Sequence, residues 1–205
     1  MLLTSSTIIE VVKRECNSGS ALMGYFYFDF NDIDKQSHRG LLTSLLSQLA
    51  AESDLCYDVL YDLFLTNAKG SRLPSDSALT ECLKDILRLP QQPTTYIILD
   101  ALDECPNTSG LLTARGQVLD LLEELVSLNL SNLRICVTSR PEADIITVLE
   151  PLTSLRVSIH DQRGQMRDII DYINAVVHSD RRMRRWRSKD QQLVIDTLSA
   201  RADGM

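Results

Sequence analysis

Residues 94–104 read TTYIILDALDE in one-letter code. The first six residues, Thr94–Leu99, are β-branched or apolar without interruption, which is typical of a strand buried on both faces of a sheet. Three acidic residues follow within five positions: Asp100, Asp103 and Glu104. Strands of this kind belong to parallel sheets, in which ligands bind at the carboxyl ends of the strands. The segment therefore indicates both the fold class and the place where chemistry should be sought.

Acidic residues at the tip of a buried strand are costly unless something compensates their charge. A hydrated Mg²⁺ on a nucleotide is one such partner, since Mg²⁺ keeps its waters and needs only one or two carboxylates. We interpret Asp100 as a magnesium-binding residue of this kind, the Walker B arrangement of phosphate-loop NTPases. Asp103 and Glu104 then supply a second acidic group that can orient or deprotonate an attacking water. The alternative interpretation is an acidic loop that only caps a strand.

A second strand of the buried type, Leu133–Thr138, ends in Ser139, Arg140 and Pro141. An arginine at the carboxyl end of a neighbouring strand can reach a γ-phosphate and report whether it is present. The same tripeptide also makes ordinary surface turns. Its place on the strand after the acidic segment favours Arg140 as a nucleotide-binding residue.

The remaining pattern alternates strands with helices, which predicts a parallel sheet covered by helices on both faces. We expect an α/β core over residues 1–160 and the beginning of a helical part over residues 161–205. Further strands are expected at Ala21–Phe30 and Leu155–Ile159. Helices are expected at Thr7–Glu15, Leu41–Leu49, Tyr57–Leu65, between a Ser77 cap and Pro90, at Gln117–Leu128 and at Ala143–Leu149, and onward from Asp161.

Composition limits the class of protein. The 205 residues are enough for one α/β domain with a buried core, and 44% apolar with 24% charged residues is the balance of a globular chain. A net charge of −7 argues against a general nucleic-acid binder. No apolar run is long enough to cross a bilayer. Five scattered cysteines without a Cys-x-x-Cys pair suit reduced thiols, so we expect a cytoplasmic protein.

Three other patterns are weaker. The histidines lie apart from one another and from cysteine pairs, which argues against zinc. The Asp29, Asp32 and Asp34 group lacks the glycine and glutamate of a calcium loop, so a solvated loop is the better interpretation. Six basic residues surround Trp186 in residues 181–189; they could bind RNA or an acidic membrane, but a solvated helix is favoured. The three histidines of the zinc argument above are His38, His160 and His178.

Two segments resemble the NACHT family: YIILDALDEC at residues 96–105 and RICVTSRP at residues 134–141. The resemblance is closest to the nephrocystin-like N-terminal NACHT domains of large fungal signalling proteins. The aromatic strand at Tyr25–Asp29, the leucine-rich helix at Leu41–Leu49 and the ending Ala202–Met205 also match. The resemblance therefore covers essentially the whole chain.

This resemblance implies a three-layer phosphate-loop NTPase fold and a nucleotide-controlled switch of the STAND class. It makes Asp100 the magnesium residue, Asp103 and Glu104 the catalytic acidic pair, and Arg140 the phosphate sensor. ATP or GTP with Mg²⁺ would be the cofactors of the complete domain. Protein partners or self-association would act through effector and repeat domains outside this chain, and no nucleic-acid partner is implied.

The family's first element is a strand followed by Gly-x-x-x-x-Gly-Lys-Ser/Thr, and the chain contains no such string. Gly19 and Gly24 have the nearest spacing, but Tyr25 and Phe26 follow them, and the segment precedes a strand instead of following one. We therefore expect a truncated core that begins just after the loop's lysine, binds no nucleotide alone and is inactive alone. The alternatives are a non-catalytic interaction module that retains the fold and a fragment of another AAA-type ATPase.

Overall fold

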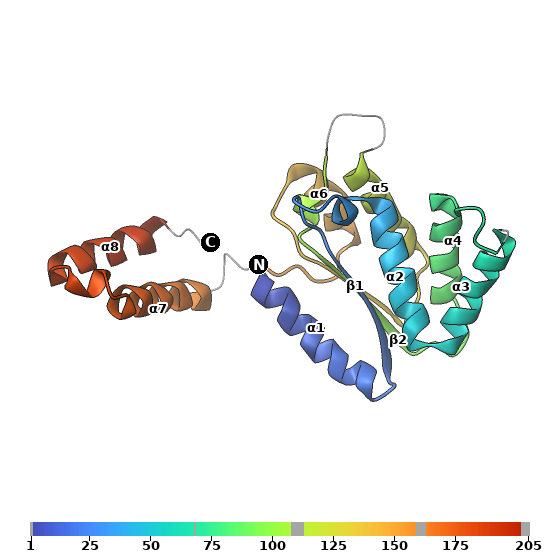
Figure 1. Ribbon diagram of the computed structural model, residues 1–205, viewed down its shortest axis with the longest axis horizontal. Helices are drawn as coiled ribbons and strands as arrows, with labels where there is room; N and C mark the ends of the chain where they lie inside the picture. The colour runs from blue at the N-terminus through green and yellow to red at the C-terminus, as the bar shows by residue number, and fades with distance from the viewer. Residues whose placement is uncertain (1, 68, 108–112, 159–162, 202–205) are drawn as a thin grey trace. The chain divides into compact units, whose positions relative to one another are not determined.

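The computed structural model describes residues 2–67, 69–107, 113–158 and 163–201 (Figure 1). The chain divides into two compact units, Met1–Leu152 and Thr153–Met205. We call the first the sheet unit and the second the helical unit. The sheet unit carries all four of the residues predicted to form the functional site.

The sheet is parallel, as predicted, and in the described residues it has three strands in the order β1–β2–β3. Tyr27 lies opposite Asp100, and Leu99 lies opposite Val137, so the carboxyl ends of the three strands lie level at one edge. The strands are β1 (Ala21–Tyr27), β2 (Thr94–Asp100) and β3 (Leu133–Val137). β1 ends three residues earlier than the predicted Phe30.

Most helices of the sheet unit have a serine or threonine residue as their N-cap. Serine or threonine hydroxyls accept the free backbone N–H groups at the start of α2, α3, α4 and α5. The predicted Ser77 cap is wrong, because Ser75 accepts from the amide of Ala78 and the helix already begins at Asp76. The helices are α1 (Leu2–Asn17), α2 (His38–Glu52), α3 (Asp54–Thr66), α4 (Asp76–Leu87), α5 (Ala114–Ser127) and α6 (Ala143–Leu149), with 3-10 turns η1 (Ile33–Gln36), η2 (Leu102–Glu104) and η3 (Glu150–Leu152).

Helices cover both faces of the sheet, which is why the middle of β2, Ile97–Leu99, is apolar on both sides and buried. Ile97 and Leu99 pack into a large apolar cluster with α2, α4 and α5. Ile98 points to the other face and packs against Ile9 and Val12 of α1. Figure 1 shows α1 on the opposite side of β1 and β2 from α2. The buried leucines of α2 are those of the predicted helical stripe: Leu41, Leu42, Leu45, Leu46 and Leu49.

The strand expected at Leu155–Ile159 is not formed over its described part, residues 155–158. Leu155 is 78% exposed and Val157 is 60% exposed. A β-branched, alternating segment becomes a strand only where a neighbour offers backbone partners and a face to bury. Within the described residues no strand pairs with this segment, so the prediction is wrong there; Ile159 lies outside the described residues.

The helical unit consists of α7 (Arg163–Ser179) and α8 (Ser188–Arg201), joined through the 3-10 turn η4 (Met183–Arg185). Val177 and Ile195 are its buried apolar residues among those described. The six basic residues of the 181–189 run are exposed, and they lie mostly on a turn instead of the predicted helix. Asp180 stabilises this turn, because its carboxylate accepts the backbone amides of Arg182 and Met183. His160 and Ala202–Met205 lie outside the described residues.

None of the helices in the described part of the chain combines the length and the apolar character that crossing a bilayer requires.

Candidate functional site

All four predicted site residues lie at the carboxyl edge of the sheet. Asp100 is the last residue of β2, while Asp103 and Glu104 lie in the turn η2 that follows it. Arg140 lies in the loop after β3. Asp100 is only 3% exposed, and its carboxylate accepts a hydrogen bond from the Thr138 hydroxyl, which directly follows β3. The ends of two neighbouring strands are thus joined by a buried carboxylate.

The chain reverses sharply at Ala101. Its φ of +56° is in the left-handed region, which costs an L-residue about 1–2 kcal/mol. Thr138 stabilises this turn: its hydroxyl accepts the amide of Ala101 at 3.1 Å, and its carbonyl accepts the amide of Leu102 at 3.0 Å. Strained residues held by several such bonds are common at functional sites. The turn brings Asp103 and Glu104 back over the edge of the sheet.

Asp103 joins the loop after β2 to the loop after β3. One of its carboxylate oxygens, Oδ1, accepts the backbone amide of Arg140 at 3.0 Å. The other, Oδ2, lies 3.4 Å from Nε of Arg140. The Asp103 side chain is 5% exposed, whereas that of Arg140 is 75% exposed. Asp103 is therefore the fixed partner, and the arginine presents its guanidinium to solvent.

Glu104 points toward a third loop. Its Oε2 accepts the backbone amide of Phe30, in the loop after β1, at 3.4 Å. This is a long, exposed hydrogen bond, and such bonds contribute little to stability. The two acids of the predicted pair therefore differ: Asp103 is buried and held by an arginine, while Glu104 is half-buried and weakly held.

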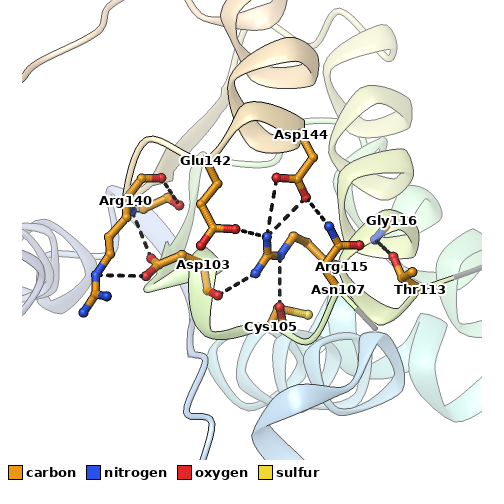
Figure 2. Close-up of polar contacts among 10 residues, drawn as sticks. Asp103, Cys105, Asn107, Thr113, Arg115, Gly116, Arg140, Glu142 and Asp144 are labelled. Atoms are coloured by element: carbon orange, nitrogen blue, oxygen red, sulfur yellow. Dashed lines mark hydrogen bonds and ion pairs between the residues drawn. The ribbon is translucent and has the colours of Figure 1, made fainter. Parts of the chain in front are cut away.

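Arg115, the second residue of α5, is the centre of a polar network that sequence reasoning missed (Figure 2). Its Nε donates to the Cys105 carbonyl at 2.9 Å, and its Nη2 donates to the Asp103 carbonyl at 2.6 Å. Its Nη1 donates to the carboxylate of Glu142 and, at 3.2 Å, to Oδ2 of Asp144. One buried guanidinium thus holds the turn after β2 against the segment that begins α6.

Burial and charge together set the chemistry of this network. Burial by itself would lower the pKa of Arg115, but the hydrogen-bonded carboxylates of Glu142 and Asp144 raise it, so the guanidinium stays charged. Burial raises the pKa of the Cys105 thiol to about 11. Because only the thiolate is a good nucleophile, Cys105 is an inert core residue at neutral pH. The network is therefore an ion-pair clamp without a reactive nucleophile of its own.

The sequence pattern of the family described as Nephrocystin 3, N-terminal, matches residues 3–140. That span contains the three strands, the acidic turn and Arg140. The chain belongs to the Nephrocystin 3, N-terminal family. No curated protein and no solved structure matches it.

In this nephrocystin N-terminal domain, the predicted residues are gathered at one edge but do not all touch. Asp103 contacts Arg140, Asp100 contacts Thr138, and Glu104 reaches toward Phe30. Within the described ranges, no three His, Cys, Asp or Glu side chains are grouped as a metal cage. Magnesium does not need such a cage, since it takes one or two carboxylates and completes its shell with water and phosphate. The donors at this edge fit such a partial site.

Two residues missed by sequence reasoning organise the site, and each carried a signal. Arg115 lies in the first turn of α5, where the helix dipole disfavours a basic side chain. A basic residue at such a position indicates a specific acidic partner. Thr138 directly precedes Ser139 and Arg140 in the motif, and its signal is a hydroxyl at the end of an otherwise apolar strand segment.

The aspartates near the end of β1 cap turns of the nephrocystin domain. Oδ1 of Asp29 accepts the amide of Asn31 at 2.9 Å, and Oδ1 of Asp32 accepts the amide of Asp34 at 3.2 Å. Asp32 also lies 3.4 Å from the Lys35 ammonium. These contacts account for the spacing of the acids by turn formation.

Proposed function

We propose that this domain is the magnesium- and water-handling part of a NACHT-type, nucleotide-dependent signalling switch built on a phosphate-loop NTPase-like sheet. One observation carries the proposal: Asp100, Glu104 and Arg140 converge at the carboxyl edge of a parallel sheet, where α/β proteins bind ligands. Such a switch would act through protein partners, reached by effector and repeat domains.

The contacts of each residue suggest its role. Asp100 would hold Mg²⁺, which neutralises phosphate charge when bound. Glu104 is the better candidate for orienting the attacking water, because its carboxylate is only weakly engaged, at 3.4 Å from the Phe30 amide. The carboxylate of Asp103 is occupied by Arg140 and would serve to position that arginine. The exposed guanidinium of Arg140 would contact the γ-phosphate of ATP or GTP.

Most phosphate contacts in such sites come from a glycine-rich loop and its lysine, and these 205 residues contain no such string. We therefore expect the isolated chain to bind Mg-ATP no more tightly than the millimolar range. Isothermal titration calorimetry measures this directly. A micromolar dissociation constant would mean that the chain has a phosphate site of another kind.

The deciding experiment places a strand and a Gly-x-x-x-x-Gly-Lys-Ser/Thr loop ahead of the chain and measures nucleotide binding and turnover. Glu104→Gln should then lower turnover by roughly 10²- to 10⁴-fold, which is the usual contribution of a general base, and leave binding nearly intact. Asp103→Asn is the matched control and should have the smaller effect on turnover. If Asp103→Asn abolishes hydrolysis while Glu104→Gln does not, the water-activating residue is Asp103.

A second function, a non-catalytic interaction module, has one observation in its favour. The carboxylate of Asp103 and the guanidinium of Arg115 make contacts that stabilise loops and leave little free for chemistry. If the extended protein hydrolyses no nucleotide above background, and neither Glu104→Gln nor Asp103→Asn alters this, the acidic pair is structural and this second function is the correct one.

A further inference from the structure

The segment that joins α7 to α8 concentrates the positive charge of the helical unit. Residues 181–189, which we call the basic turn, contain six basic residues and no acidic one. All six side chains are exposed, and in the part of the chain that the structure describes none of them forms an ion pair. Their charge is therefore free to act on a partner. The six residues are Arg181, Arg182, Arg184, Arg185, Arg187 and Lys189.

The backbone of the basic turn is held in one conformation. The carboxylate of Asp180 accepts the amides of Arg182 and Met183 at 2.8 and 3.0 Å. The carbonyl of Met183 accepts the amide of Trp186 at 3.0 Å and the side-chain amide of Gln191 at 2.8 Å. Figure 1 shows α7 and α8 side by side with this turn at one end of the pair. The six cations thus extend from a fixed end of a helical hairpin.

Helix stability accounts for only part of this charge. Cations are favoured at the carboxyl end of a helix and disfavoured at its amino end, because of the helix dipole. Arg181 and Arg182 follow the end of α7, where a cation is favoured. Arg187 directly precedes α8, and Lys189 is its second residue, where a cation is disfavoured. The charges at the start of α8 therefore need another explanation.

Trp186 lies among these cations, between Arg185 and Arg187, and is 46% exposed. An indole ring left half exposed forgoes part of the free energy that its burial would contribute. Indole rings favour the interface between a membrane and water, where an apolar body and a polar N–H are both accommodated. Cations around an exposed indole therefore suit a partner surface that is anionic and partly apolar.

The charge of the whole chain is unevenly distributed. Residues 153–205 carry ten basic and seven acidic side chains, whereas residues 1–152 carry eleven basic and 21 acidic side chains. Such an asymmetry between two parts of a chain is typical of a basic part that meets an anionic partner. The partner is thus expected at the helical unit, although the chain as a whole is acidic.

Two classes of partner are rich in phosphate: nucleic acids and anionic membranes. A single strand of nucleic acid is held in a basic groove in which several aromatic rings stack on successive bases. The basic turn has one aromatic residue and lies at the end of a helix pair. A flat layer of anionic headgroups can be contacted by several cations at once and takes up a single indole at its interface. These features favour the membrane.

We propose that the basic turn docks on the surface of a membrane rich in anionic phospholipids. The arginines bind lipid phosphates, for which the planar guanidinium is well suited, and the indole of Trp186 lies at the level of the headgroups. The docking is peripheral and reversible. It is independent of the proposed nucleotide switch, because none of its residues belongs to the sheet unit.

The test uses the whole chain and two kinds of vesicle, one of phosphatidylcholine alone and one with about a third phosphatidylserine. Flotation on a density gradient separates bound from free protein. We expect flotation with the anionic vesicles only. Trp186 is the single tryptophan of the chain, so its fluorescence reports the docking directly and should shift to shorter wavelength. Equal flotation with both vesicles, or an unchanged emission spectrum, would overturn the proposal.

Variants locate the contact. The double variant Arg184→Gln, Arg185→Gln should weaken vesicle binding about tenfold or more, since each basic residue near an anionic membrane contributes about fivefold. The matched control is Arg167→Gln, Arg201→Gln, which removes two exposed cations of the same unit from the helix ends remote from the turn. The control should bind nearly like the parent. If both double variants lose affinity equally, only net charge matters and the proposal is wrong.

A nucleic-acid partner is a separate outcome. A labelled single-stranded RNA oligonucleotide is titrated with the chain in fluorescence anisotropy at the same salt concentration. Binding to the oligonucleotide that is tighter per phosphate than binding to the anionic vesicles would assign the basic turn to RNA and overturn the proposal. Circular dichroism melting of each variant verifies that the fold is retained.

Discussion

At the scale of single residues, the candidate site depends on one buried cation. Arg115 is 5% exposed and uses all three guanidinium nitrogens to bind two backbone carbonyls and two carboxylates. Asp103, whose carbonyl is one of these acceptors, in turn binds Arg140 with its carboxylate. The position of the exposed arginine is therefore coupled through Asp103 to the start of α5.

Removing this cation should destabilise the protein. Arg115→Ala leaves the Cys105 and Asp103 carbonyls without donors, and we expect a loss of about 2–3 kcal/mol in urea unfolding. That is below the usual cost of breaking a buried pair, because Glu142 and Asp144 are 43% and 35% exposed and can be hydrated. Arg115→Lys should recover only part of the loss, since one ammonium cannot reach all four acceptors.

The matched control for this experiment is Arg88→Ala. Arg88 is an exposed arginine that ends α4, with its guanidinium 3.7 Å from Asp85. Exposed pairs contribute at most about 1 kcal/mol, so this change should be nearly silent. An Arg115→Ala variant as stable as Arg88→Ala would show that the network does not stabilise the fold.

His38, the first residue of α2, should make stability depend on pH. Burial lowers the pKa of His38, against opposing effects from Asp76, Glu124 and Asp120. The unfolded state then binds the proton more readily, so stability is full above the unfolded pKa of about 6.5 and is lost as pH falls below it. We expect the unfolding free energy to drop between about pH 7 and 5, by less than about 1.4 kcal/mol per pH unit.

Urea unfolding at several pH values measures this slope, and His38→Leu should reduce it. The remaining slope in that variant belongs to carboxylates, which titrate at lower pH. A slope that is identical in the two proteins would mean that His38 does not contribute.

At the scale of elements, the two edges of the sheet differ in how the outward-facing backbone N–H and C=O groups of the edge strands are hydrogen-bonded. The outer edge of β1 is closed by α2: Oε1 and Nε2 of Gln48 bond the amide and carbonyl of Tyr25 at 3.0 and 2.8 Å. Oε2 of Glu52 accepts the amide of Met23 at 3.0 Å. Side chains that occupy edge backbone groups prevent another strand from pairing there.

Gln48→Leu should therefore weaken the protein at β1. It leaves the amide and carbonyl of Tyr25 without partners, at a cost of about 1–3 kcal/mol, and should speed hydrogen exchange of the Tyr25 amide. Ser47→Ala, one position earlier on the exposed face of α2, is the control and should change stability by less than about 0.5 kcal/mol. Unchanged exchange at Tyr25 would contradict the role given to Gln48.

At the opposite edge of the sheet, no side chain among the described residues bonds the outward-facing backbone groups of β3 as Gln48 and Glu52 do for β1. The carbonyl of Asn132 and the amide of Thr138 bond to β2, so the alternate positions Ile135 and Val137 turn their backbone groups to the other side. No partner for these groups lies within the described residues. Their side chains pack against the core, which keeps the strand extended and ready to pair.

At the scale of the whole molecule, this edge predicts self-association of the isolated chain. Light scattering coupled to gel filtration should show dimers or larger species whose share grows with concentration. Ile135→Pro removes an amide that faces the open edge and should reduce association. Ile135→Ala loses side-chain packing but keeps the amide, so it should associate like the parent. A monodisperse monomer that melts cooperatively at all concentrations would contradict this prediction.

The local pattern of apolar and polar residues in the sequence predicts many of the helices and strands. Mostly apolar runs predicted β2 and β3, because a strand covered by helices on both faces has few polar positions; Arg134 of β3 is exposed and is an exception. Helical spacing predicted α2, whose leucine stripe is buried, and α6 at its observed bounds, Ala143–Leu149. The strand at Leu155–Ile159 failed over its described part, because strand formation depends on a pairing partner that no local pattern reveals.

For the candidate site, the predicted order of strands and loops is enough to name residues at the sheet edge. The parallel order of β2 and β3 necessarily brings the residues after each strand to one side, so Asp100 and Arg140 could be named in advance. The folded chain shows in addition that Asp103 binds Arg140, that Glu104 does not, and that Arg115 holds the turn. Those contacts join residues that are far apart along the chain, and their partners are chosen by side-chain packing and burial, which leave no periodic mark in a single sequence.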